Sequence, residues 1–403
     1  MPTRNASPRS LTGASLADIL FRSAALEVRR IADRDGRIAV VTFDSHHDEP
    51  GFARPGFGED YFERENVGAI HVMCHGNDWF QHAEMPDALR AVLAAASSER
   101  RLLAYGSSMG GYAAIRFADA VGASAVLALS PQYSVDPRKM RFERRWLEDQ
   151  RRIRFHRALD GRIRTRAHIV IAYDPHLDAD RRHVDRIARD VAVTRLSLPH
   201  AGHPVGTFLA ETALLAPLVT QVRENLLDTV AIADTAHRRR GSSSSWLGEL
   251  AARQPPWRAR CAVALARRAV AITPDSPAAH HRLGLRLYGA GEFSAAVAAH
   301  REAIRLHPAF GYRWSLGKAL AAAEGPAAAL PVAQSLQAAA PHLAGYHRWA
   351  ADLRLALGDE TGALADLRAA TIAAPYHRGY RWRARRLAWS LRLARWRERL
   401  IRR

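Results

Sequence analysis

The 403-residue sequence is poor in cysteine and has no long hydrophobic run. Its two cysteines, Cys74 and Cys261, argue against a disulfide framework and favour a reducing, cytoplasmic location. A helix that spans a membrane needs about 18 or more consecutive apolar residues, and no such run occurs. The N-terminus also lacks a continuous apolar segment followed by a small-residue cleavage site, so we do not expect a signal peptide.

Cofactor motifs are absent as well. The chain has no phosphate-binding Gly-x-x-x-x-Gly-Lys loop, no dinucleotide-binding glycine fingerprint and no regular metal-ligand spacing, so we expect neither a cofactor nor a metal. Lysine occurs only at Lys139 and Lys318, and arginine supplies the rest of a net charge of +19. This charge favours acidic partners, but it does not distinguish nucleic acid from anionic lipid or an anionic substrate. No firm signal for nucleic acid is present.

The first half of the chain alternates short apolar runs with amphipathic segments. The first two predicted strands, Leu26–Ile31 and Arg37–Phe43, flank a turn at Asp33–Gly36 and are expected to form a hairpin. The later predicted strands are Ala69–Cys74, Leu102–Tyr105, Ala125–Leu129, His168–Tyr173 and Val191–Leu198. The predicted helices are Met85–Ser98, Gly110–Val121, Arg144–Leu159, Asp180–Arg189 and Val205–Leu227. Strands that are apolar throughout suit a mostly parallel sheet that is buried on both faces, so this half is predicted to be an α/β domain.

The strongest motif lies between the strand at Leu102–Tyr105 and the helix that follows it. There the sequence reads Gly106-Ser-Ser108-Met-Gly110, which is a Gly-x-Ser-x-Gly turn in a strand–turn–helix setting. Side chains at Gly106 and Gly110 would collide with the neighbouring strand and helix. Ser108 would sit at a helix N-terminus, where free N–H groups favour developing negative charge.

This turn resembles the nucleophile elbow of the α/β hydrolases, a family in which an acid and then a histidine follow the serine along the chain. The resemblance implies that Ser108 is the nucleophile and that His203, in the loop after the last strand, is the general base. Asp174, directly after the strand His168–Tyr173, is the preferred acid that orients the histidine. Asp178 is the alternative acid, although it could equally cap the helix that follows.

The same resemblance implies an oxyanion hole, formed by the backbone N–H of Met109 and a second donor from the loop after the third strand. Strand counting assigns Arg37–Phe43 to that third position, so the second donor is expected at Asp44 or Ser45. Three residues of the loop after the next strand are then expected to contact substrate, namely Asn77, Trp79 and Gln81, with a place in the core as the alternative for Trp79.

The second half of the chain is helical and repetitive. Four prolines recur at spacings of 34, 33 and 34 residues, namely Pro274, Pro308, Pro341 and Pro375. Small residues stand twelve positions before each of them, at Ala262, Ala296, Ala329 and Ala363. Small residues at fixed offsets let two antiparallel helices pack closely, and proline ends the second helix. The pattern resembles the tetratricopeptide repeat (TPR), which implies a solenoid that binds a protein partner.

The final segment carries three tryptophans at intervals of seven, Trp382, Trp389 and Trp396, among many arginines. One interpretation is a capping helix with a solvated arginine face. The other is a basic amphipathic helix that touches an anionic surface.

The whole chain is thus predicted to be an α/β-hydrolase-like domain followed by an all-α TPR solenoid. The expected divisions are a tail (1–24), the α/β domain (25–235), a flexible linker (236–245), the repeats (246–375) and the basic C-terminal helix (376–403). The expected function is that of a serine hydrolase acting on an ester or acyl substrate. The alternatives are an acyltransferase and an interaction protein whose hydrolase domain is inactive.

Overall fold

The computed structural model describes residues 18–48, 50–96 and 101–401, and it divides between Trp246 and Leu247 into two compact units. Among these residues no helix is long and apolar enough to cross a membrane. The predicted N-terminal tail falls outside the described residues up to position 17, but Asp18–Arg22 forms strand β1 rather than part of a loose tail.

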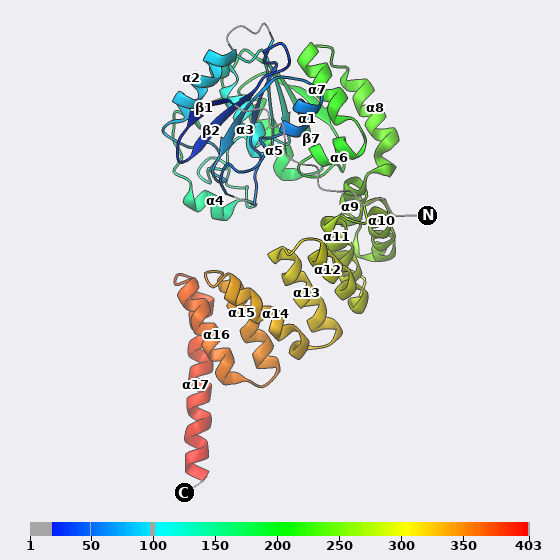
Figure 1. Ribbon diagram of the computed structural model, residues 1–403. Helices are drawn as coiled ribbons and strands as arrows, with labels where there is room; N and C mark the ends of the chain where they lie inside the picture. Colours follow the sequence, from blue (N-terminus) through cyan, green and yellow to red (C-terminus); the bar gives the residue numbers. More distant parts are fainter. Residues whose placement is uncertain (1–17, 49, 97–100, 402–403) are drawn as a thin grey trace, which may run out of the picture. The chain divides into compact units, whose positions relative to one another are not determined.

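The first unit is built on one eight-stranded sheet (Figure 1). Its strands are β1 (Asp18–Arg22), β2 (Leu26–Ile31), β3 (Val40–Phe43), β4 (Ala69–Cys74), β5 (Leu103–Ser107), β6 (Ala125–Leu129), β7 (His168–Tyr173) and β8 (Thr194–Ser197). They are arranged in the order β1-β2-β4-β3-β5-β6-β7-β8, and β3 to β8 run parallel to one another. The prediction of a mostly parallel α/β domain is confirmed.

The expected hairpin between Leu26–Ile31 and the next strand is wrong. β2 pairs antiparallel with β1 on one side and with β4 on the other, so β4 separates it from β3. All six residues of β4 are buried and five of them are apolar, so this strand gains more by lying inside the sheet than at its edge. β3 therefore lies between β4 and β5, which places the loop that follows it beside the end of β5.

Helices cover both faces of the sheet and supply two apolar cores. One core includes residues from α2 (Met85–Ala96), α3 (Met109–Phe117) and α5 (Asp178–Ile187). The other includes residues from α1 (Glu59–Arg64), α6 (Gly206–Glu211), α7 (Leu215–Glu224) and α8 (Thr229–Arg239). The long helix predicted at Val205–Leu227 is broken at Ala213, where the backbone takes a positive φ of 54°.

The predicted basic helix Arg144–Leu159 is reduced to α4 (Leu147–Arg152), which lies within the long connection between β6 and β7. The predicted linker is not a flexible segment. It is mostly helical, and its serines Ser243 and Ser245 are buried and donate hydrogen bonds to the carboxylate of Glu211. Helix α9 (Ser244–Ala252) continues from it across the division between the units.

The second unit consists of packed helices (Figure 1). They are α10 (Ala259–Ile272), α11 (Pro277–Gly289), α12 (Phe293–Leu306), α13 (Phe310–Ala323), α14 (Pro326–Ala339), α15 (Ala344–Ala356), α16 (Glu360–Ala373) and α17 (Arg378–Ile401). The small residues of the repeat lie at helix contacts, because Ala296, Ala329 and Ala363 are fully buried. A Cβ at Gly317 of α13 would lie 2.2 Å from the ring of Trp349 of α15, so the absence of a side chain at Gly317 leaves room for this ring.

Candidate active site

The Gly-x-Ser-x-Gly turn joins β5 directly to α3. Ser108 lies between them with φ 52° and ψ −112°, a positive-φ conformation that is uncommon for a residue with a side chain. A Cβ on Gly106 would lie 2.3 Å from the carbonyl carbon of Gly110, and a Cβ on Gly110 would lie 2.1 Å from the carbonyl oxygen of Phe43. Both glycines are therefore required by close backbone packing, as the sequence predicts.

The structure brings Ser108 and His203 together. The Oγ atom of Ser108 lies 3.0 Å from Nε2 of His203, which comes from the loop after β8. The other ring nitrogen, Nδ1, lies 2.8 Å from Oδ2 of Asp180 in the first turn of α5. Burial alone would raise the pKa of Asp180, but hydrogen bonding and charge from His203 and Arg145 outweigh it and lower the pKa below its ordinary value.

Neither of the two acids predicted from the sequence lies beside the His203 ring, so the prediction is corrected from Asp174 or Asp178 to Asp180. The buried carboxylate of Asp174 accepts backbone N–H groups from His176, His200 and Gly202, so it shapes the loop that carries the histidine. Asp178 begins α5 on its exposed side and pairs with Arg181 and Arg182. Two residues later the helix has turned inward, and Asp180 is buried.

A second group approaches Ser108 from the loop after β6, and sequence reasoning missed it. The Gln132 Nε2 group donates a hydrogen bond of 3.0 Å to Ser108 Oγ, and Gln132 Oε1 accepts one of 3.3 Å from the indole N–H of Trp79. Because an indole N–H can only donate, Trp79 fixes which end of the Gln132 amide faces the serine. The one available signal was a polar residue shortly after a predicted strand, but the contacts of Gln132 with Ser108 and Trp79 span 24 and 53 residues.

These contacts define the direction of the hydrogen bonds through the site. Ser108 Oγ accepts from Gln132, so its own proton is directed to Nε2 of His203. Nδ1 of His203 then carries the proton that Asp180 accepts. Arg145 donates to the other oxygen of Asp180 at 2.7 Å, so both oxygens of this carboxylate accept a hydrogen bond.

The three predicted oxyanion positions have different environments. Met109 is the first residue of α3, where the amides of a first helical turn have no partner within the helix. Ser45 lines the same cavity as Ser108 and His203. Asp44 does not fit the prediction, since its amide donates to the carbonyl oxygen of Val72 and its carboxylate accepts from Arg54 and the Cys74 amide.

The cavity above Ser108 has a volume of about 390 Å³. It is lined mainly by apolar and aromatic side chains, including Phe57, Tyr105, Leu129, Trp146 and Leu215, together with the polar groups His46 and Thr207. Trp146 comes from the β6–β7 connection, so this connection forms part of the wall. Such a lining suits the apolar part of a small-molecule ligand.

The residues predicted to contact substrate do not line this cavity and instead hold loops together. Asn77 makes two hydrogen bonds to the backbone of His47. Trp79 is fully buried against Gln132, and Gln81 is buried while it donates to Tyr112 Oη and accepts from the His156 amide. Their roles are therefore corrected from substrate contact to support of the site.

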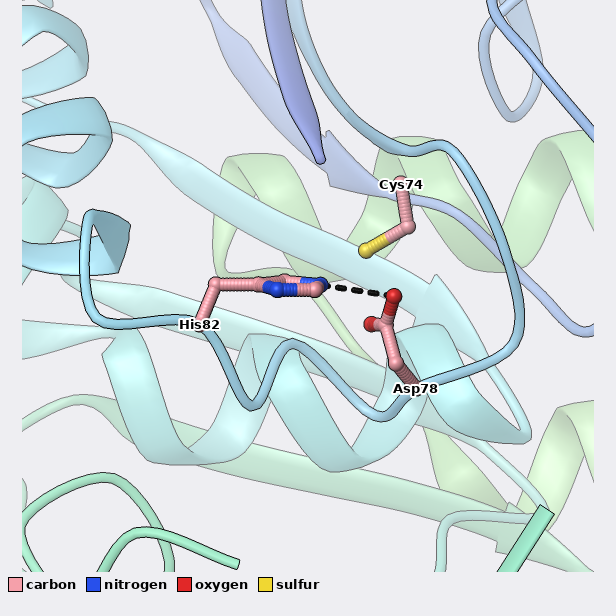
Figure 2. A group of neighbouring side chains, drawn as sticks. All are labelled: Cys74, Asp78 and His82. Carbon is pink, nitrogen blue, oxygen red and sulfur yellow. Dashed lines mark ion pairs between the residues drawn. The ribbon is translucent and has the colours of Figure 1, made fainter. Parts of the chain in front are cut away.

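A separate group combines three side chains able to bind a metal. Cys74 at the end of β4 meets Asp78 and His82 of the following loop, and one donor atom from each lies within 4.8 Å of the others (Figure 2). His82 Nε2 forms an ion pair of 2.6 Å with Asp78 Oδ2. In this described part of the chain, a thiol, a carboxylate and an imidazole therefore lie close enough together to bind one cation.

Comparison with known proteins gives only distant similarities. No family model matches the chain, and a search of the curated proteins finds no match. Among solved structures, YrrB, a TPR protein with an unusual peptide-binding site, is 18% identical over 43% of this chain and 88% of its own, with a TM-score of 0.33. A thermophilic TPR protein from Thermus thermophilus is 19% identical over 45% of this chain and 99% of its own, with a TM-score of 0.32.

The capsule O-acetyltransferase of Neisseria meningitidis serogroup A is 10% identical over 44% of this chain and 85% of its own, with a TM-score of 0.34. The chain itself combines an α/β unit, built on a mostly parallel sheet, with a unit of packed helices whose small residues recur at the spacing of the tetratricopeptide repeat.

Proposed function

We propose that the chain is a serine hydrolase of the α/β-hydrolase kind, which forms an acyl-enzyme on Ser108. The observation that carries this proposal is the continuous set of hydrogen bonds from Ser108 Oγ through the His203 ring to Asp180, at 3.0 and 2.8 Å. The elbow geometry at Ser108 and the chain order of serine, acid and histidine support the same assignment.

In the proposed reaction, His203 Nε2 takes the proton of Ser108 as Oγ attacks the carbonyl carbon of the substrate. Asp180 stabilises the imidazolium that forms, and Arg145 keeps this carboxylate in place. The amides of Met109 and Ser45 are the proposed donors to the oxyanion. His203 then protonates the leaving group, and a water molecule or an alcohol releases the acyl group from Ser108.

A fluorophosphonate probe tests the nucleophile directly. We expect the folded full-length chain to be labelled covalently, and Ser108→Ala to abolish the labelling because no other hydroxyl replaces Oγ. Ser107→Ala is the matched control, since Ser107 is the adjacent buried serine and lines the same cavity. Failure of the folded wild type to react, or labelling that persists in Ser108→Ala, would contradict the proposal.

Gln132 has a proposed positioning role that can be measured separately. Gln132→Glu replaces the amide donor by a carboxylate that can only accept, so the Ser108 proton would turn towards it and away from His203. A displaced catalytic group can cost about 100-fold in rate, and we expect a loss of this order in kcat with little change in KM. A KM effect without a kcat effect would indicate a role in substrate binding instead.

For the helical unit, we propose that it recruits a protein partner through its TPR-like surface. Within this unit, aromatic rings of α13 and α15 pack together, with Trp314 against Tyr346 and Trp349 at 5.4 and 4.8 Å between ring centroids. In α17 the side chains of Trp382, Trp389 and Trp396 are each more than half exposed. Exposed tryptophans among arginines support the proposal that this helix touches an anionic surface.

A further inference from the structure

We propose that Cys74, Asp78 and His82 form a binding site for one divalent cation of the zinc class. The three residues recur at intervals of four, at the last position of β4 and in the loop that follows it. Their donor atoms converge, since Sγ, a carboxylate oxygen and a ring nitrogen lie within 4.8 Å of one another and face a common point (Figure 2).

The chemistry of the three donors selects the cation. A thiolate, an imidazole and a carboxylate are the ligands that zinc accepts in tetrahedral sites, whereas magnesium and calcium prefer oxygen alone. Asp78 and His82 are each about a fifth exposed, so a water molecule can reach a fourth position beside the three protein ligands.

Asp78 and His82 form an ion pair that cation binding would replace. Nε2 of His82 lies 2.6 Å from Oδ2 of Asp78 as an ion pair. Two ligands of one zinc ion at about 2.0–2.1 Å in tetrahedral geometry lie about 3.3 Å apart, so these two atoms would separate slightly when the cation binds.

Charge balance supports a divalent ion in particular. Cys74 is fully buried, and its thiolate would stand beside the carboxylate of Asp78. Binding releases the thiol proton, and the thiolate and carboxylate then neutralise the two charges of the cation while the imidazole stays neutral. The nearby Asp44 is already paired with Arg54 and the Cys74 amide, so it is not needed as a ligand.

The cation would act on the loop that holds the site of Ser108. Asp78 and His82 flank Trp79, whose indole fixes Gln132. Trp79 and Phe80 both have positive φ, 51° and 58°, so this loop conformation is costly for the chain alone. A cation bound on both sides of Trp79 would stabilise it. The cation site itself does not depend on the proposed hydrolase activity.

Cobalt substitution in the full-length chain tests the proposal. We expect about one zinc per chain after loading and dialysis, and a thiolate-to-cobalt charge-transfer band when cobalt replaces zinc. Cys74→Ser should abolish the band, while Cys261→Ser, which changes the exposed cysteine of the other unit, should retain it.

His82→Gln and Asp78→Asn provide a second measurement if Cys74→Ser does not fold. Loss of a residue that only supports a metal ligand costs about 10–100-fold in metal affinity. Each of these two substitutions removes a ligand itself, so each should weaken zinc binding by more than that. Zinc that is absent from the folded wild type after loading, or a cobalt band that survives Cys74→Ser and disappears in Cys261→Ser, would overturn the site. Unchanged zinc affinity in both His82→Gln and Asp78→Asn would also overturn it.

Discussion

Replacement of Asp180 by asparagine is expected to slow acylation of Ser108 by about 10⁴-fold while the chain remains folded. An asparagine can present its NH₂ group to Nδ1 of His203, which is 2.8 Å from the carboxylate in the wild type. The ring would then carry its proton on Nε2, and that nitrogen could no longer accept the proton of Ser108. Stopped-flow measurement of fluorophosphonate labelling, or of hydrolysis of a small acyl ester, gives the rate.

Two matched controls come from the acids that the sequence favoured. Asp178→Asn should leave the rate within a few fold of wild type, because Asp178 is exposed and pairs only with arginines of its own helix among the contacts described. Asp174→Asn should mainly lower the free energy of unfolding, because the carboxylate of Asp174 accepts hydrogen bonds from three backbone amides of the loops around His203. Its effect on the acylation rate of the folded protein should be smaller than that of Asp180→Asn. If Asp180→Asn acylated at the wild-type rate while Asp174→Asn or Asp178→Asn lost about 10⁴-fold, that other aspartate would be the acid that orients His203.

Asp178, the alternative acid, was misplaced because a helix boundary lay two residues from its expected place. The sequence predicts a helix that starts at Asp180 with Asp178 before it, whereas α5 starts at Asp178. At a rotation of about 100° per residue, a shift of two positions exchanges an exposed side chain for a buried one. Chain order therefore locates the region after β7 that carries the carboxylate beside His203, but not the residue.

Local patterns predicted more of the site than long-range pairings did. The elbow at Ser108 and the histidine loop at His203 each depend on a few adjacent residues, and the structure brings both together. Gln132 and Trp79 meet only because β4 and β6 lie in one sheet, so no spacing along the chain indicates their contact. For the same reason the insertion of β4 beside β2 could not be foreseen from the turn at Asp33–Gly36.

Gly110→Ala is expected to give the largest loss of stability among single substitutions at the elbow. A Cβ there would lie 2.1 Å from the carbonyl oxygen of Phe43 and 2.8 Å from that of Asp44. Both are backbone atoms, and β3 is fixed between β4 and β5. Overpacking of a core usually costs about 1–3 kcal/mol, and a clash with an immobile backbone should exceed about 3 kcal/mol.

Chemical denaturation of Gly110→Ala, compared with wild type, measures this cost. Gly76→Ala is the control in the same unit, because a Cβ at Gly76 meets no atom within 4 Å. Equal stability of all three proteins would show that the elbow does not require glycine at position 110.

The same contact connects stability to the proposed chemistry. Gly110 packs against the end of β3, and Ser45 follows two residues after Phe43 and lines the cavity of Ser108. A chain that relieves the Gly110→Ala clash by moving this loop would also move the proposed oxyanion donor. Labelling by the fluorophosphonate probe should therefore fall together with the free energy of unfolding in Gly110→Ala, whereas Ser108→Ala should lose labelling and keep its stability to within about 1 kcal/mol. A stable Gly110→Ala variant that labels at the wild-type rate would show that the spacing between β3 and the elbow is not what positions these groups.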